Sequence, residues 1–394
     1  MGLFIIFLSC GRTITLVDMK VIEMKKMSRR EAMKQLGSKV VASAGIAGGA
    51  GLLTNQAHAD EADATIEWKM VTSWPKNLPG PGMSAQRICD RINTMSGGRM
   101  RVRLYAAGEL VPAFEVFDAV SSGTAQMGHS ASLYWQGKMP AAAFFCTVPF
   151  GLTPSEHVTW IEQGGGQELW NNLYAPFGVL PLMAGNTGPT MAGWFKEEIH
   201  SPTDMKGLKI RAVGIGGEVL RHLGASAVSI SSSELFTAFQ SGVVDAVEFL
   251  GPWTDGALGF QKIAKNYYAP GFNKPNGTGE ALLNKVAFEG LDKDLQEIVK
   301  TACRIEADIA LAEANAANAY ALSELINHEG VKLNGFSNEL ETALRVAADD
   351  VMADFIAKDN GAKEVYQSYS KAKSDYSGWS KLSLVSYLGL RDKD

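Results

Sequence analysis

The segment GLKIRAVG, residues Gly207 to Gly214, places a short apolar run between two glycines. This pattern predicts a strand over residues 209–213 with one face toward a core. Arg211 lies in the middle of that strand, where burying a guanidinium is costly unless an anion lies beside it. Because a guanidinium presents a planar fork of donors that matches a carboxylate, Arg211 either pairs with an internal Asp or Glu or anchors an anionic ligand.

The stretch from residue 66 to residue 105 predicts a strand, a helix and a second strand. Ile66 to Thr72 and Met100 to Tyr105 read as strands, and Met83 to Met95 carries apolar residues at helical spacing. A βαβ unit of this kind is typical of a parallel sheet in an α/β protein. Trp74 follows the first strand, at the strand end where ligands of open α/β sheets bind, although packing is the plainer role for a lone tryptophan.

A nine-residue pattern occurs twice, about 119 residues apart. Glu115 to Gly123 (EVFDAVSSG) and Glu234 to Gly242 (ELFTAFQSG) both read E-[VL]-F-x-A-[VF]-x-S-G. Each predicts the end of an amphipathic helix with a glycine cap, followed by an apolar strand over residues 125–127 or 243–247. Polar and aromatic residues follow these strands: His129, Tyr134 and Trp135 after the first, and Glu248, Phe249 and Trp253 after the second. The repeat predicts two similar lobes that present side chains to a ligand between them.

The first 59 residues read as an export signal. Ser28 to Lys34 (SRREAMK) is a twin-arginine motif, an apolar run follows from Val40 to Leu53, and Ala57-His58-Ala59 fits a cleavage site. A membrane anchor is the alternative, but the run is well short of the roughly 20 residues that span a bilayer. The signal holds 8 of the 37 basic and 3 of the 42 acidic residues. The remaining chain is acidic and lacks a basic patch, which disfavours nucleic-acid binding.

Motifs of the common catalytic and metal sites are missing from the sequence. There is no GxSxG, no HExxH, no P-loop and no GxGxxG after a strand. The four cysteines, Cys10, Cys89, Cys146 and Cys303, show no CxxC spacing. An exported, acidic chain of 394 residues, long enough for two lobes, is typical of a solute-binding protein. The alternative from another class is an exported enzyme that acts on a carboxylate substrate.

The last hundred residues predict helices. Residues 292–324 read as one long helix with Asp292 as its N-cap, and Ser337 begins another that ends near Lys358. Residues 330–336 predict a strand that returns to a lobe. The tail over residues 362–390 predicts a further helix whose aromatic side chains cover a surface of this chain or of a partner.

The chain resembles the extracytoplasmic receptors of TRAP transporters, in the branch that binds 2-oxo acids and other monocarboxylates. The resemblance covers residues 66 to the C-terminus and rests on VTSWP, SGTAQMGHSASLYWQGK, GNTGPTMAGWF, SPTDMKGLKIRAVG and ELFTAFQSGVVDAVEF. It implies an α/β, two-lobed periplasmic-binding-protein-like fold, with a long helix spanning both lobes and a helical C-terminal extension. The expected parts are the export signal (1–59), lobe I (60–188, completed by later segments), lobe II (189–280) and a helical region (281–394).

The same resemblance implies how the protein works. It would capture a small organic monocarboxylate in the periplasm, after cleavage near Ala59, and deliver it to TRAP permease subunits in the membrane without catalysis. It would also form a homodimer through the C-terminal extension.

By resemblance, Arg211 grips the substrate carboxylate. The other expected substrate-binding residues are Tyr134, Trp74, Asn186, Thr190 and Phe249. Glu248 and the carbonyl of Phe249 would hold a sodium or calcium ion. The chain departs from the branch in having Pro189-Thr190 where an amide is usual and Lys274 where a glutamate is usual, which removes oxygen ligands for a hard cation. Lys274 either replaces that cation beside Glu248 or points into solvent.

Overall fold

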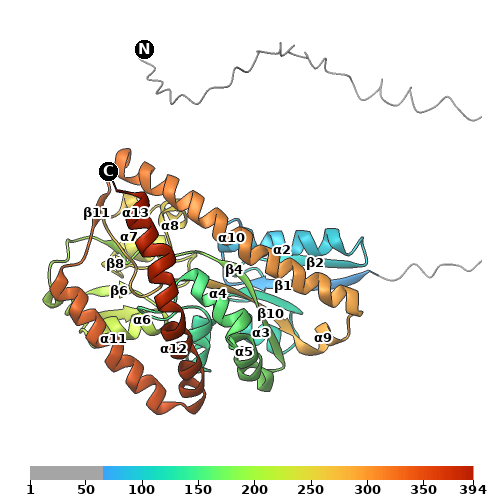
Figure 1. Ribbon diagram of the computed structural model, residues 1–394. Coiled ribbons are helices and arrows are strands. Elements are labelled where there is room, and N and C mark those ends of the chain that lie inside the picture. Colours follow the sequence, from blue (N-terminus) through green and yellow to red (C-terminus); the bar gives the residue numbers. More distant parts are fainter. Residues whose placement is uncertain (1–64, 394) are drawn as a thin grey trace, which may run out of the picture. The chain divides into compact units, whose positions relative to one another are not determined.

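The computed structural model describes residues 65–393, which contain two separate β-sheets, one in each lobe (Figure 1). The α/β class and the two-lobed arrangement expected from the sequence are confirmed. The twin-arginine motif, the apolar run and the cleavage site at Ala59 lie outside the described residues. Within residues 65–393, every helix is too short or too polar to cross a membrane.

The sheet of lobe I has the strand order β2-β1-β3-β10-β4. Its strands are β1 (Ile66–Thr72), β2 (Met100–Tyr105), β3 (Met127–Ser130), β4 (Val179–Asn186) and β10 (Thr278–Asn284). The first three strands are parallel, and β10 is antiparallel to both β3 and β4. Helices on this lobe are α2 (Pro81–Met95), α3 (Val116–Ser121), α4 (Pro154–Gln163), α5 (Gly166–Tyr174) and α9 (Lys285–Glu289).

The sheet of lobe II has the order β11-β9-β5-β8-β6-β7. Its strands are β5 (Gly193–Phe195), β6 (Lys209–Arg211), β7 (Ser226–Val228), β8 (Ala246–Val247), β9 (Asn266–Tyr268) and β11 (Lys332–Asn334). Strands β7, β6 and β8 are parallel, and β5 is antiparallel to both β8 and β9, so the pattern of lobe I recurs. Helices α6 (Gly214–His222), α7 (Leu235–Ser241) and α8 (Pro252–Leu258) belong to this lobe.

The repeated nine-residue pattern has the same conformation in both lobes. It forms α3 in lobe I and α7 in lobe II, and Gly123 and Gly242 both have φ of 79°. The chain then folds back on each helix, because Ala125 N donates to Ala119 O and Val244 N donates to Ala238 O. The strands therefore begin at Met127 and Ala246, later than the sequence predicts.

Three of the connections between the lobes lie next to the site: two extended segments and one helix. The segment from β4 to β5 runs beside the segment from β9 to β10, and Thr187 N donates to Gly277 O while Thr190 N donates to Lys274 O. We call this pair of segments the hinge ribbon (residues 187–192 and 269–277). The third connection is α10 (Lys293–Asn327), which packs on β4 and α2 of lobe I and on α8 of lobe II (Figure 1). The predicted long helix is thus confirmed, with ends close to those expected.

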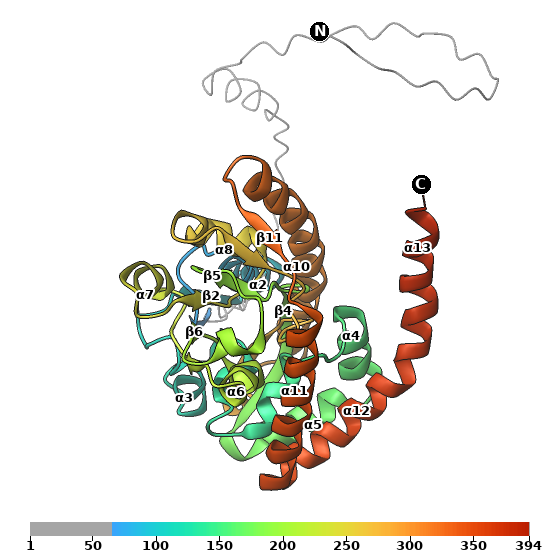
Figure 2. The same ribbon diagram turned by 90° about the vertical axis from the view of Figure 1, so that its left-hand side faces the viewer.

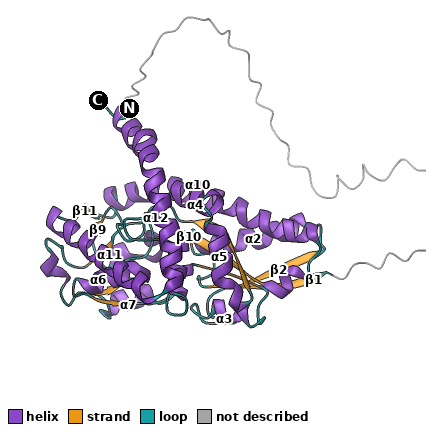
Figure 3. Cartoon of the chain, turned by 60° about the horizontal axis from the view of Figure 1, so that its bottom comes forward, coloured by secondary structure: helices purple, strands orange, loops and turns teal. Residues whose placement is uncertain are grey.

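The C-terminal region is helical from residue 338 onward. It consists of α11 (Asn338–Lys358), α12 (Asn360–Ser380), a π-helical turn (Lys381–Ser386) and α13 (Tyr387–Arg391). Tyr369 of α12 is buried, and its hydroxyl accepts a hydrogen bond from Leu152 N. Beyond α12 the chain extends away from the two lobes (Figures 2 and 3). The exposed large apolar residues of this part of the chain are Trp379, in the last turn of α12, and Leu382, Leu384, Val385, Tyr387 and Leu390.

Candidate functional site

Arg211 is the last residue of β6, and its side chain is fully buried. Its Nε donates to Ile230 O at 3.2 Å and one terminal nitrogen, NH1, donates to Glu248 O at 2.5 Å. NH1 also lies 3.7 Å from Glu248 Oε2. The other terminal nitrogen, NH2, is buried and has no hydrogen-bond partner among residues 65–393. Since a buried donor without a partner is costly, this nitrogen marks where a ligand oxygen would bind.

Glu248 lies between two cations. It directly follows β8, is 1% exposed, and its Oε1 is 2.5 Å from Lys274 Nζ. Lys274 is itself buried on the hinge ribbon, and its ammonium also donates to the carbonyl of Phe249. The Phe249 ring stacks against the Arg211 guanidinium at 5.1 Å from the ring centroid. Burial excludes the alternative in which Lys274 points into solvent.

A small cavity lies next to Lys274 and Phe249, whereas Arg211 and Glu248 do not line it. Its volume is about 40 Å³. It is lined by Trp74, Pro81, Ala131, Leu133, Tyr134, Cys146, Thr187, Phe249, Leu250, Lys274, Gly277, Thr278 and Gly279. Because one water needs at least about 10–15 Å³, the cavity has room for only a few non-hydrogen atoms. Its walls are mostly apolar, so a ligand would be recognised by one charged end and a short apolar body.

Tyr134 lies between this cavity and solvent. Its side chain lines the cavity and also a wider opening of about 350 Å³, which Val213, Gly214 and Arg221 line from lobe II. Burial raises the pKa of Tyr134, whereas the nearby positive charge of Arg211 acts in the opposite direction. A neutral hydroxyl at this position can donate a hydrogen bond to an anion that Arg211 holds.

Trp74 is fixed by His129, which lies near the end of the neighbouring strand β3 in lobe I. Trp74 Nε1 donates to His129 Nδ1 at 2.8 Å, so His129 Nε2 carries the proton and donates to Ala184 O at 3.0 Å. Burial lowers the pKa of His129, which keeps the imidazole neutral. The lobe I side of the site is therefore uncharged at this point.

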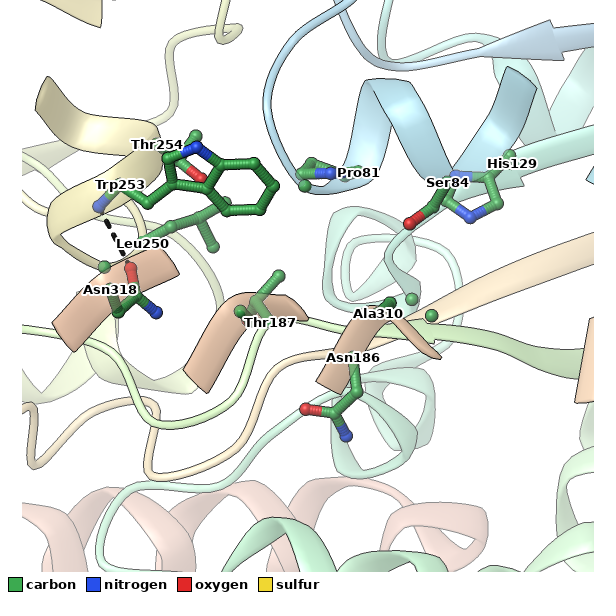
Figure 4. A pocket seen from close by; sticks show the side chains of 15 residues that line it. Pro81, Ser84, His129, Asn186, Thr187, Leu250, Trp253, Thr254, Ala310 and Asn318 are labelled. Atoms are coloured by element: carbon green, nitrogen blue, oxygen red, sulfur yellow. Dashed lines mark hydrogen bonds between the residues drawn. The ribbon is translucent and has the colours of Figure 1, made fainter. Parts of the chain in front are cut away.

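A second, narrower cavity of about 20 Å³ lies beside the first (Figure 4). Trp253 of α8 and His129 face it from different lobes, and Ala310 and Asn318 of α10 also line it (Figure 4). Asn318 Oδ1 accepts a hydrogen bond from Trp253 N at 3.0 Å. The long helix thus contacts the region between the lobes next to the first cavity.

Two of the expected substrate-binding residues use their polar groups within the chain. Asn186 lines the second cavity, where its amide donates to Asn276 Oδ1 and accepts from Gly188 N, both at 2.8 Å. Thr190 donates its hydroxyl to Lys274 O at 3.0 Å. The Thr190 contact joins the two segments of the hinge ribbon, and the Asn186 contacts tie the end of β4 to the ribbon. Neither residue lines the first cavity. The expected site residues that do line it are Trp74, Tyr134, Phe249 and Lys274.

Sequence motifs did not single out some residues that line the first cavity. Leu133, Cys146 and Thr278 are among them, and their residue types are as common in an ordinary core as in a binding site. Burial raises the pKa of the Cys146 thiol to about 12, so it stays protonated and is no nucleophile. The glycines of the hinge ribbon are one sequence signal that could have found this region. Glycine is needed where two backbone segments approach closely, and a Cβ on Gly277 would lie 2.1 Å from Thr187 Oγ1.

The chain is similar to a known family of proteins over most of its length. Residues 71–359 match the model of bacterial extracellular solute-binding proteins, family 7. The chain is 38% identical over 362 residues to a monocarboxylate 2-oxoacid-binding periplasmic protein of Nostoc sp., covering 92% of this chain and 98% of that one.

Solved structures of the same kind are also similar. A TRAP periplasmic solute-binding protein from Pseudoalteromonas atlantica, with bound sodium and pyruvate, is 36% identical with a TM-score of 0.81, covering 84% of this chain and all of that one. A TRAP solute-binding protein from Bordetella bronchiseptica is 34% identical with a TM-score of 0.80, covering 83% of this chain and 98% of that one. Its structure is a mixed-occupancy dimer, with calcium and picolinate in the occupied site.

Proposed function

Because this chain belongs to family 7 of the bacterial extracellular solute-binding proteins, the receptors of TRAP transporters, we propose that it captures pyruvate or a similarly small 2-oxo monocarboxylate and delivers it to a membrane permease. The observation that carries this proposal is the buried, unpaired NH2 of Arg211 among the described residues. A carboxylate oxygen is the acceptor that a guanidinium nitrogen binds most strongly.

The dimensions and walls of the cavity support the choice of acid. A volume of about 40 Å³ suits an acid with a very short side chain. Trp74, Leu133 and Phe249 offer apolar contacts for that side chain, while Tyr134 offers a hydroxyl beside the carboxylate. The similar proteins that bind pyruvate or 2-oxo acids support the same class of ligand.

The protein is a binding protein and not an enzyme, as its family is. An exported enzyme was the alternative from the sequence alone. The protonated Cys146 lines the first cavity and the neutral, hydrogen-bonded His129 lines the second, and neither provides an activated nucleophile.

The test is a binding screen on the purified mature chain. Pyruvate and other 2-oxo monocarboxylates should raise the melting temperature and bind with one-to-one stoichiometry in calorimetry, because a ligand at 100 times its Kd stabilises the fold by about 2.7 kcal/mol. The acid should be recovered unchanged. If no monocarboxylate binds in any buffer, with or without sodium and calcium, the proposed function is wrong.

Export by the twin-arginine route belongs to the same proposal. The cell would export the folded receptor to the periplasm and remove residues 1–59. Replacing Arg29 and Arg30 by lysine should leave the receptor in the cytoplasm with its signal attached. Intact-mass measurement of the periplasmic fraction checks this, and a mature chain that begins elsewhere than Asp60 would contradict the cleavage site.

A homodimer through the C-terminal extension is the last part of the proposal. The exposed apolar side chains from the last turn of α12 onward, such as Trp379 at 70% and Leu390 at 66%, form a surface that a second copy would cover. Dimer formation in the Bordetella bronchiseptica protein supports this. Light scattering of the mature chain and of a chain ending at residue 378 should show a dimer and a monomer, respectively. An equal mass per particle for both would contradict it.

A further inference from the structure

Lys274 is the most unusual charged residue of the site. Lysine is rarely buried, yet this side chain is 7% exposed. Its ammonium contacts Glu248 Oε1, donates to Phe249 O and lies 6.0 Å from the centre of the Phe249 ring. A carboxylate, a carbonyl and an aromatic face together compensate for the lost hydration of the ammonium.

The backbone of Lys274 is held as firmly as its side chain. Lys274 O accepts hydrogen bonds from Thr190 N at 3.2 Å and from Thr190 Oγ1 at 3.0 Å. Three residues earlier, a Cβ on Gly271 would lie 2.4 Å from Thr190 O, so the two segments approach closely. The hinge ribbon therefore sets the position of the ammonium before a ligand arrives.

The ammonium contacts the oxygen atoms that a metal ion would need. Sodium and calcium prefer carboxylate and carbonyl oxygens, and here Glu248 Oε1 and Phe249 O both contact Lys274 Nζ. Among the described residues, His, Cys, Asp and Glu form no group of three that could hold a metal ion. The sodium and calcium seen in similar proteins thus have no open position between these two oxygens.

We infer that Lys274 is a built-in cation, and that this receptor binds its acid without sodium or calcium. The inference rests on the proposed function. It adds that the Lys274 ammonium takes the place of the metal ion in the binding site. Arg211 and Lys274 each contact Glu248, so these three side chains carry two positive charges and one negative charge. One monocarboxylate neutralises the remaining positive charge, whereas an added metal ion would leave a buried excess.

The first experiment uses the wild-type chain. Pyruvate affinity is measured by calorimetry in a sodium-free buffer with a chelator, and again with added sodium or calcium, with choline chloride holding the ionic strength constant. The expected Kd is the same within about twofold in all three buffers. A Kd that rises about tenfold or more after chelation and recovers with either ion would overturn the inference.

The second experiment exchanges the built-in charge. Lys274→Glu should bind pyruvate more than about tenfold more weakly in the cation-free buffer and regain affinity with calcium or sodium. Lys274→Gln removes the positive charge without adding a negative one, on a side chain one atom shorter, and it should also lose affinity without cations. Lys363→Glu, on an exposed position of α12, makes the same charge change away from the site and should bind as wild type.

The outcomes separate this inference from the proposed function. If both Lys274 variants bind pyruvate like wild type in the cation-free buffer, Lys274 is not the required cation and the inference is wrong. Acid binding that needs an added ion in the wild-type chain also refutes it but leaves the receptor function intact. Should a variant fail to fold, the wild-type measurement alone decides.

Discussion

The two lobes build the same strand end and place different chemistry on it. His129 and Glu248 are separated by 119 positions, the same offset as the repeated helices before them. In lobe I, the imidazole is neutral and links Trp74 to Ala184 by hydrogen bonds. In lobe II, the carboxylate is held between Arg211 and Lys274. Lobe I thus supplies shape, and lobe II together with the hinge ribbon supplies charge.

The neutrality of lobe I extends to the next strand. Glu280 of β10 pairs with Ser130 of β3, and its buried carboxyl accepts hydrogen bonds from Trp135 Nε1 and Tyr174 OH. Burial raises the pKa of Glu280 to about 8, so this group is mostly protonated at neutral pH. A ligand carboxylate therefore meets little negative charge from lobe I, and its binding depends on the charges of lobe II.

The largest expected effect is the loss of Arg211. Arg211→Ala should weaken pyruvate binding by about 2–5 kcal/mol, because the ligand carboxylate and Glu248 both lose their partner. Arg211→Lys should also bind poorly, since a point charge cannot reproduce the fork. Calorimetry on folded protein measures the loss. The exposed Arg304→Ala is the matched control, and wild-type affinity in Arg211→Ala would disprove a charged role for lobe II.

The second prediction concerns Glu280 and stability. Its pKa rises on folding from 4.5 to about 8, so its contribution to stability is complete below pH 4.5 and falls as the pH rises toward 8. The loss amounts to roughly 5 kcal/mol, since the pKa changes by about 3.5 and one pKa unit is 1.36 kcal/mol. Glutamine resembles the neutral form of the acid. The stability of Glu280→Gln should therefore increase relative to that of the wild type as the pH rises over this range. Denaturant unfolding at several pH values measures the difference, and a difference that does not change with pH would contradict a neutral Glu280.

A smaller effect is expected from His129. His129→Ala leaves Trp74 Nε1 and Ala184 O without their partner, at a cost of about 1–3 kcal/mol in unfolding free energy for an unsatisfied group. Pyruvate affinity should fall much less than for Arg211→Ala, because no charge is removed. His129→Gln offers both an acceptor and a donor and should recover part of the stability. If His129→Ala loses as much affinity as Arg211→Ala, the division between shape and charge is wrong.

The smallest expected change is in overall dimensions. If the ligand brings the two lobes together around it, as domain closure does in periplasmic binding proteins, pyruvate should lower the radius of gyration slightly. Small-angle scattering with and without saturating ligand measures this, and the Arg211→Ala chain should show no change. An unchanged radius for wild type at saturation would mean that the lobes are already closed around an empty cavity.

Much of the fold was open to prediction because its signals are local. The period of apolar residues identifies β1, α2 and α10, and the repeated nine-residue pattern indicates two equivalent lobes. The start of β3 and of β8 could not be predicted, since it depends on Ala125 and Val244 bonding back to the preceding helices. The insertion of β10 between β3 and β4 also needed the three-dimensional structure, because the pairing is between strands far apart in sequence.

The site was predictable only where charge marks it. Arg211 stood out as a charged residue in a predicted apolar strand. Lys274 stood out because the resembled receptors usually have a glutamate at this position, near Glu248. Leu133 and Cys146 carry no such mark, because a cavity wall and a core use the same residues. Asn186 and Thr190 lie in the expected loop, yet their polar groups join the hinge ribbon. A polar side chain can bind a ligand or can make hydrogen bonds within the chain. Its spatial neighbours decide between the two, and a single sequence does not give them.

Helix α10 gives the hinge a mechanical character. Arg87 and Arg91 of α2 clamp Glu306 of this helix to lobe I, and Asn318 fastens it to Trp253 of lobe II. Its 35 residues include neither glycine nor proline, so no point along about 50 Å of helix can act as a free joint. If a ligand rotates the lobes, this helix would have to bend along its length, and it would then act as an elastic element in parallel with the hinge ribbon.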